Sequence, residues 1–135
     1  MTLIVDASVG VKLGVLEEGA DRAKALVKRL EPLVAPELFV AEVCNALWGK
    51  EVRGQLALGQ RASALASCVG SINELVACAD LAERALELAV VLNHPVYDCF
   101  YLALTEARGG TFITADARLL ARLGQGGWAG RVEAL

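Results

Sequence analysis

Four acidic residues in four separate segments are candidates for one shared site: Asp6, Glu42, Asp98 and Asp116. Two carboxylates about 4 Å apart repel each other by roughly 4 kcal/mol at an effective dielectric near 20. A cluster of four therefore needs protons or a cation to neutralise it. An all-oxygen ligand set suits hard cations such as Mg²⁺ or Mn²⁺. Such an ion activates water and neutralises phosphoryl charge, so the residues predict metal-assisted hydrolysis of a phosphodiester.

Other catalytic chemistries lack their residues in this chain. His94 is the one histidine and precedes Pro95, so we interpret it as a loop residue rather than a base. Neither a serine–histidine nor a cysteine–histidine pairing is indicated, and no glycine-rich nucleotide-binding loop occurs. The four cysteines form no C-x-x-C pair and are interpreted as buried free thiols.

Each acidic residue also has a purely structural interpretation. Asp6 and Asp116 are good N-cap residues for the helices expected after them. Asp98, in the first turn of a helix, suits the helix dipole. Glu42 is the hardest to explain in this way, because it lies in the very apolar segment 38–44, where a carboxylate is at least partly shielded from water.

Hydrophobic periodicity predicts alternating strands and helices over a single domain of residues 1–135. We expect a helix at 80–92 to begin at Asp80, with Glu83 completing a capping box. The alternation predicts an α/β domain with a mostly parallel central sheet. The expected strands are 2–5, 33–35, 74–78, 111–114 and 132–135, and the expected helices are 9–17, 20–30, 38–53, 60–72, 80–92, 97–108 and 116–123.

This order of elements brings the acidic residues to one edge of the sheet. Asp6 directly follows the strand 2–5, and Asp116 lies two residues after the strand 111–114. Sites in such sheets lie beyond the carboxyl ends of the strands. Asp98 and Glu42, each early in a helix, are expected to converge on the same crevice.

Composition and charge bound the class of protein. The chain has 135 residues, 56% of them apolar, and a net charge of −3. That charge argues against a protein that coats nucleic acid through bulk electrostatics. The apolar runs are far shorter than a membrane span, and the first residues lack the pattern of a secretory signal. We therefore expect a cytoplasmic protein without a membrane segment.

Four motifs in order resemble those of PIN domains (PilT N-terminus), especially toxin nucleases of the VapC type. The first runs from Asp6 through Ala-Ser-Val-Gly-Val, and the second from Pro36 to Leu47 around Glu42. The third is His-Pro-Val-Tyr-Asp-Cys-Phe-Tyr around Asp98, and the fourth is Thr-Phe-Ile-Thr-Ala-Asp-Ala-Arg around Asp116. The resemblance spans nearly the whole chain.

The resemblance implies a three-layer α/β/α sandwich that uses Mg²⁺ or Mn²⁺ to hydrolyse single-stranded RNA. It implies that the four acidic residues bind the metal, that hydroxyls of Ser8 and Thr114 lie beside it, and that Asn45 supports the cluster. It also implies a homodimer and inhibition by a small antitoxin protein whose extended tail enters the active-site groove. Together these features describe the toxin of a toxin–antitoxin pair.

Residues outside the motifs carry weaker expectations. Lys12 and Arg118 are candidates for contacts with the RNA backbone near the mouth of the groove. Tyr97 and Tyr101 are interpreted as packing residues rather than as platforms for bases.

Two other functions remain open at this stage. One is a catalytically silent PIN-like module that binds RNA or protein. The other is a phosphotransfer enzyme with Asp6 as the nucleophile, although the chain lacks the second carboxylate that the best-known phosphatase motif has two residues later.

Overall fold

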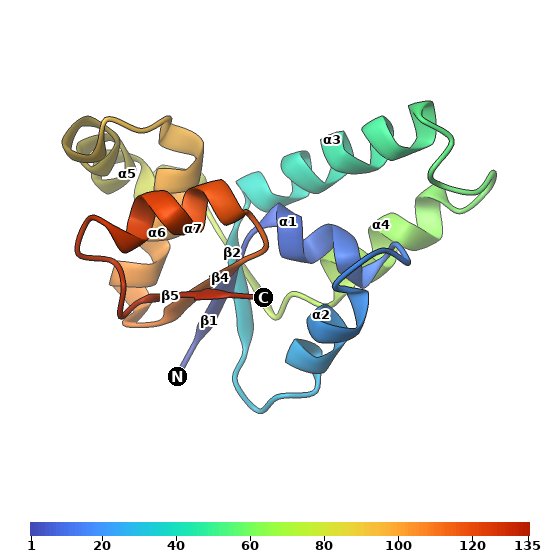
Figure 1. Cartoon of the computed structure of the whole chain (residues 1–135), viewed down its shortest axis with the longest axis horizontal. Coiled ribbons are helices and arrows are strands. Elements are labelled where there is room, and N and C mark those ends of the chain that lie inside the picture. Colours follow the sequence, from blue (N-terminus) through green and yellow to red (C-terminus); the bar gives the residue numbers. More distant parts are fainter.

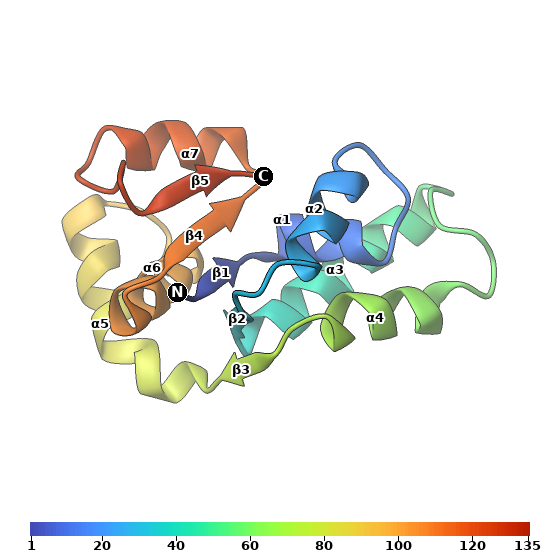
Figure 2. The same cartoon turned by 90° about the horizontal axis from the view of Figure 1, so that it is seen from below.

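The computed structural model describes residues 1–135 and is built around a parallel five-stranded sheet in the order β3-β2-β1-β4-β5 (Figures 1 and 2). The buried central strand β1 is apolar throughout and pairs on one side with β2 and on the other with β4. The strands are β1 (Leu3–Val5), β2 (Leu33–Pro36), β3 (Glu74–Val76), β4 (Thr111–Thr114) and β5 (Val132–Ala134).

Helices cover both faces of the sheet and complete a three-layer α/β/α sandwich. Their bounds are α1 (Ala7–Gly10), the 3-10 turn η1 (Val11–Leu13), α2 (Ala20–Val27), α3 (Leu38–Val52), α4 (Arg61–Gly70), α5 (Cys78–Leu92), α6 (Val96–Arg108) and α7 (Ala117–Gly124). Figures 1 and 2 show α3 and α4 projecting away from the sheet as a hairpin of helices. The expected mostly parallel α/β sheet is confirmed, and all five strands are parallel.

Alternating strand residues build two separate cores, as the period of a strand requires. Ile4, Val34 and Phe112 belong to the larger core, which includes residues of α3, α5 and α6. Leu3 and Ile113 belong to a smaller core with residues of α1 and α2. The sheet is therefore covered on both sides, and polar groups are left for its edges.

Two expectations about helices were wrong. The helix expected at 9–17 begins at Ala7, because Asp6 caps it, and gives way to a 3-10 turn that ends at Leu13. Asp80 does not cap α5: the helix begins at Cys78, directly after β3 pairs with β2, and Asp80 lies within its first turn. An acid there still interacts favourably with the helix dipole.

Two remaining expectations concern the thiols and the membrane. Cys68 and Cys99 are buried as expected, Cys78 is half-buried and Cys44 is exposed, and all four are free. No single helix is long and apolar enough to cross a membrane, and α5 and α6 reach that length only as a pair bent by 115°.

Candidate active site at the carboxyl edge of the sheet

Asp6 is fixed at the end of β1 by hydrogen bonds to both of its carboxylate oxygens. Ser8 Oγ donates to Oδ1 and Thr114 Oγ1 donates to Oδ2, each at 2.5 Å. The backbone N–H of Val9 also donates to Oδ1, at 3.3 Å, which makes Asp6 the N-cap of α1. The side chain is almost fully buried, with a residue exposure of 7%. Its orientation is therefore set by the surrounding chain.

The two hydroxyls that hold Asp6 are themselves oriented by the backbone after β4. Ser8 Oγ accepts a hydrogen bond from the N–H of Ala115 at 2.9 Å, and Thr114 Oγ1 accepts one from the N–H of Asp116 at 3.1 Å. Each hydroxyl has one proton, and the accepted bonds turn both protons toward Asp6. This network joins the carboxyl ends of β1 and β4.

Glu42 lies on α3, half-buried, and accepts a hydrogen bond at Oε1 from the hydroxyl of Tyr101 at 2.6 Å. Burial is the main cause that raises the pKa of Glu42 above its usual value, and the negative charges of Asp6 and Asp98 raise it further. Burial likewise raises the pKa of Asp6, opposed by its hydroxyl partners and reinforced by the charge of Asp98. Three carboxylates on β1, α3 and α6 thus lie within electrostatic reach of one another.

Asp98, in the first turn of α6, lies beside the chain's one histidine. Its Oδ2 is 2.7 Å from His94 Nε2. Asn93, in the left-handed conformation with a φ of 49°, ends α5 and turns the chain toward this pair. Arg122 of α7 donates to the carbonyls of Leu92 and Asn93 and so holds the same turn.

Asp116 is the exposed member of the four acidic residues and caps α7. Its Oδ1 accepts hydrogen bonds from the backbone N–H groups of Arg118 and Leu119 at 3.0 and 3.1 Å. The structure therefore gives Asp116 the N-cap role, and it links Asp116 to Asp6 only through Thr114.

The donor set suits a hard divalent cation. Asp6 and Glu42 are shielded carboxylates whose hydrogen-bond partners are neutral, so their negative charge is not balanced by a side-chain cation. No three of the chain's Asp, Glu, His and Cys side chains are grouped closely enough to hold one ion as they stand. Because Mg²⁺ typically engages one or two carboxylates and keeps several waters, Asp6, Glu42 and Asp98 fit such an ion without a closed cage.

A hollow of about 390 Å³ opens beside Glu42 and is the natural place for a substrate near the carboxylates. Its polar lining comes from Ser8, Glu42, Asn45 and Tyr97, on α1, α3 and α6. The rest of the lining is apolar. Asn45 and Tyr97 are exposed, so both lie where a bound molecule can reach them.

The two candidate substrate-binding cations have different environments. Lys12 Nζ is 3.1 Å from Glu17 Oε1, and Lys50 pairs with the other oxygen of Glu17. Arg118, in the first turn of α7, is exposed. Arg118 is thus the freer of the two to contact a phosphate.

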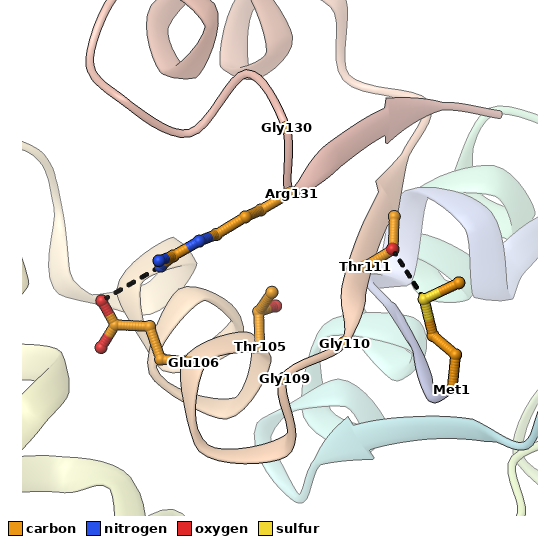
Figure 3. Close-up of a pocket in the computed structure, with 8 residues that line it drawn as sticks. All are labelled: Met1, Thr105, Glu106, Gly109, Gly110, Thr111, Gly130 and Arg131. Carbon is orange, nitrogen blue, oxygen red and sulfur yellow. Dashed lines mark hydrogen bonds and ion pairs between the residues drawn. The ribbon is translucent and has the colours of Figure 1, made fainter.

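A second hollow, of about 470 Å³, lies at the opposite edge of the sheet, where the strands begin (Figure 3). On one side of this hollow Arg131 Nη1 lies 3.8 Å from Glu106 Oε1, and on the other the hydroxyl of Thr111 contacts the sulfur of Met1. None of the predicted site residues lines it. Glu106 is the one carboxylate in its lining, so this hollow has no cluster of acidic residues.

Sequence reasoning missed the parts played by Tyr101 and His94. We interpreted both as residues without a role in the site, whereas each makes a hydrogen bond to a candidate metal-binding carboxylate. The available signal was partial: Tyr101 comes three residues after Asp98, so the two lie on the same side of α6. His94 precedes that helix and is near Asp98 only in sequence.

The comparisons with known proteins agree with this architecture. Residues 3–125 match the family model described as "PIN domain". "Ribonuclease VapC3" from Pyrobaculum aerophilum is 33% identical over 121 residues, which cover 88% of this chain and 92% of that protein.

Two solved structures share the fold. PAE2754 from Pyrobaculum aerophilum superposes with a TM-score of 0.71 at 27% identity, covering 90% of this chain and 79% of that one. VapC20 from Mycobacterium tuberculosis, described as a toxin that cleaves the sarcin–ricin loop, superposes with a TM-score of 0.68 at 19% identity. That alignment covers 89% of this chain and 94% of the other. Through the family match and the ribonuclease relative, the chain belongs to the PIN domain family.

Proposed function

We propose that this chain is a divalent-metal-dependent endoribonuclease that cleaves single-stranded RNA as the toxin of a toxin–antitoxin pair. The observation that carries the proposal is the set of carboxylates Asp6, Glu42 and Asp98, whose charges act on one another, with Glu42 lining an open hollow. Membership of the PIN domain family and the ribonuclease relative support RNA as the substrate.

In this proposal Asp6, Glu42 and Asp98 hold the cation, and Asp116 assists from the end of β4. A bound Mg²⁺ or Mn²⁺ supplies an activated water and a positive charge for the phosphoryl group. Ser8 and Thr114 keep both oxygens of Asp6 in place, which pre-organises the site for the ion. His94 orients Asp98 in the same way. Ser8, Thr114 and His94 thus orient the carboxylates, and the carboxylates supply the negative charge that attracts the cation.

Substrate contacts in this proposal come from the rim of the hollow. Asn45 supports the cluster next to Glu42, since both line the same hollow. Arg118 supplies a positive charge for an RNA phosphate. Lys12 can supply a second one when an RNA phosphate replaces Glu17 as its partner. Exposed Tyr97 offers a face on which a base can stack.

The proposed partners follow from the same groove. A small antitoxin with an extended segment in the hollow, carrying an arginine or lysine toward the three carboxylates, would neutralise their charge and exclude RNA. A homodimer is also proposed, and it is tested by measuring the molar mass of the purified chain in solution. A role in RNA cleavage implies action in the cytoplasm.

The decisive experiment is cleavage of RNA by purified protein with and without Mg²⁺ or Mn²⁺. We expect metal-dependent cleavage that chelation abolishes and that Asp98→Asn lowers at least a hundredfold. Asp80→Asn is the matched control, because Asp80 is the third residue of α5 as Asp98 is of α6. Equal activity in both variants would mean a contaminating nuclease or another site.

The silent-module alternative has one observation in its favour, namely that no three metal-binding side chains are grouped as they stand. It predicts RNA binding that does not require metal and leads to no cleavage. The phosphotransfer alternative lacks the second carboxylate two residues after Asp6, where this chain has Ser8. A phospho-aspartate trapped at Asp6 would support it.

A further inference from the structure

Tyr101 is a fully buried aromatic residue of α6 whose single polar side-chain atom reaches Glu42. Its ring stacks on Phe112 of β4, with centroids 5.8 Å apart and planes 18° apart. Its hydroxyl donates to Glu42 Oε1 at 2.6 Å, across 59 residues of sequence. Core packing therefore fixes the ring, and the ring fixes where the hydroxyl points.

The hydroxyl can act only as a donor toward Glu42. The ordinary pKa of a tyrosine phenol is about 10, so the hydroxyl carries its proton at neutral pH. The bond occupies one lone pair of one Glu42 oxygen, and the other oxygen has no hydrogen-bond partner within the chain. Glu42 can therefore accept this bond and bind a cation simultaneously.

Tyr101 lies one helical turn after Asp98 on the same helix, so α6 supplies both a carboxylate and the group that holds Glu42 of α3. A shift of α6 relative to α3 would move Asp98 and the hydroxyl together. The hydrogen bond from Tyr101 thus couples the Glu42 side chain to the helix that carries Asp98. Without the hydroxyl, Glu42 would keep the repulsion of Asp6 and Asp98 and lose the contact that holds it near them.

We propose that Tyr101 is a positioning residue that orients the Glu42 carboxylate relative to Asp98 for the binding of a divalent cation. This inference rests on the proposed metal-dependent function. Residues that orient metal ligands typically change metal affinity or activity by about 10- to 100-fold when they are replaced. Tyr101 acts through Glu42 and does not touch the ion.

The test is Mn²⁺ binding to purified Tyr101→Phe, followed by the electron paramagnetic resonance signal of free Mn²⁺. The phenyl ring keeps the packing on Phe112, so we expect a folded protein whose Kd for Mn²⁺ rises about 10- to 100-fold. RNA cleavage should recover to within a few-fold of the wild-type rate at saturating Mn²⁺. A residue that serves only the fold would change stability and leave the Kd unchanged.

Thr105→Val is the matched control. It also removes a buried hydroxyl from α6, but that hydroxyl donates to the carbonyl of Tyr101 and contacts no carboxylate. We expect its Kd for Mn²⁺ to equal that of the wild type.

Three outcomes overturn the inference: an unchanged Kd in Tyr101→Phe, an equal loss in Thr105→Val, or a Phe variant without cooperative unfolding, which would assign the hydroxyl to the fold. If the wild type binds and cleaves while Tyr101→Phe matches it, this inference alone fails. If the wild type binds no Mn²⁺, the proposed function fails with it.

Discussion

Asp6 and Thr114 are 108 residues apart in sequence, yet Thr114 Oγ1 donates a hydrogen bond to Asp6 Oδ2 at 2.5 Å. The bond joins the carboxyl ends of two neighbouring parallel strands, at the edge of the sheet where the candidate site lies. The same hydroxyl accepts from the N–H of Asp116. One side chain therefore orients a candidate metal ligand and fixes the start of the segment that carries another.

Replacing Thr114 with valine should destabilise the protein by about 1–3 kcal/mol. The variant keeps the shape of the side chain but leaves the buried Asp6 oxygen and the N–H of Asp116 without their partner. Urea denaturation at neutral pH measures the change. Thr111→Val is the control, because Thr111, on the same strand, makes only a weak contact with a methionine sulfur. Equal losses in both variants would contradict the importance of the bond.

Glu42→Gln should stabilise the metal-free protein at pH 7 and have little effect at pH 4. The pKa of Glu42 is raised in the folded state, mainly by burial. The folded protein thus holds this proton more tightly than the unfolded chain does. The protonated side chain therefore contributes its full stabilisation at about pH 4 and below, where Glu42 is protonated in both the folded and the unfolded chain. This stabilisation is lost as the pH rises through the raised pKa of Glu42 in the folded protein.

Thermal unfolding of both proteins between pH 4 and pH 7 measures this difference. It should grow with pH to on the order of 1 kcal/mol in favour of the glutamine variant. Glutamine can still accept the hydrogen bond from Tyr101, so the comparison isolates the charge. A difference that stays constant with pH, or that shrinks as pH rises, would contradict the assignment. Saturating Mn²⁺ should reverse the order at pH 7, because only glutamate gains the ion.

Asp116 allows its structural and chemical roles to be separated. Asparagine is as good an N-cap as aspartate, whereas alanine loses the cap at a cost of about 1 kcal/mol. We expect Asp116→Asn to keep wild-type stability but to lose RNA cleavage at least tenfold, and Asp116→Ala to lose both. Urea denaturation and a cleavage assay on the same preparations measure the two effects. Full activity in Asp116→Asn would mean that Asp116 caps α7 and has no part in cleavage.

Gly10 controls how closely α1 approaches α3, and with it the distance from Asp6 to Glu42. A methyl group at this position would overlap the ring of Phe39 and press on Val43. Gly10→Ala should therefore destabilise the protein by about 1–3 kcal/mol through overpacking. Gly70→Ala is the control, since a methyl group there meets no neighbouring atom. Tolerance of both changes would show that α1 can move away from α3.

The sequence predicted the sheet well, and with it the edge at which Asp6 and Asp116 lie, for a physical reason. Buried parallel strands read as short apolar runs, and residues that directly follow them must meet at one edge. Asp6 and Asp116 could be placed in this way, and both N-cap interpretations are confirmed. The Asp80 cap was wrong, because the start of α5 depends on where β3 stops pairing with β2, and propensity does not report that.

The partners of the carboxylates were beyond sequence reasoning. The contact between Tyr101 and Glu42 depends on how α6 and α3 cross, and periodicity places Tyr101 only on a buried face. The pairing of Glu17 with both Lys12 and Lys50 depends on the chain turning sharply after Leu13, where we expected a continuous helix.

The most direct test of the account is the position of Mn²⁺ in crystals of the protein soaked at pH 7, located by anomalous scattering. We predict a Mn²⁺ ion within about 2.5 Å of a carboxylate oxygen of Asp98 and of at least one from Asp6 or Glu42. Crystals of Asp98→Asn should lack that ion. Mn²⁺ bound only elsewhere, or its absence from this edge of the sheet at saturating concentration, would contradict the account.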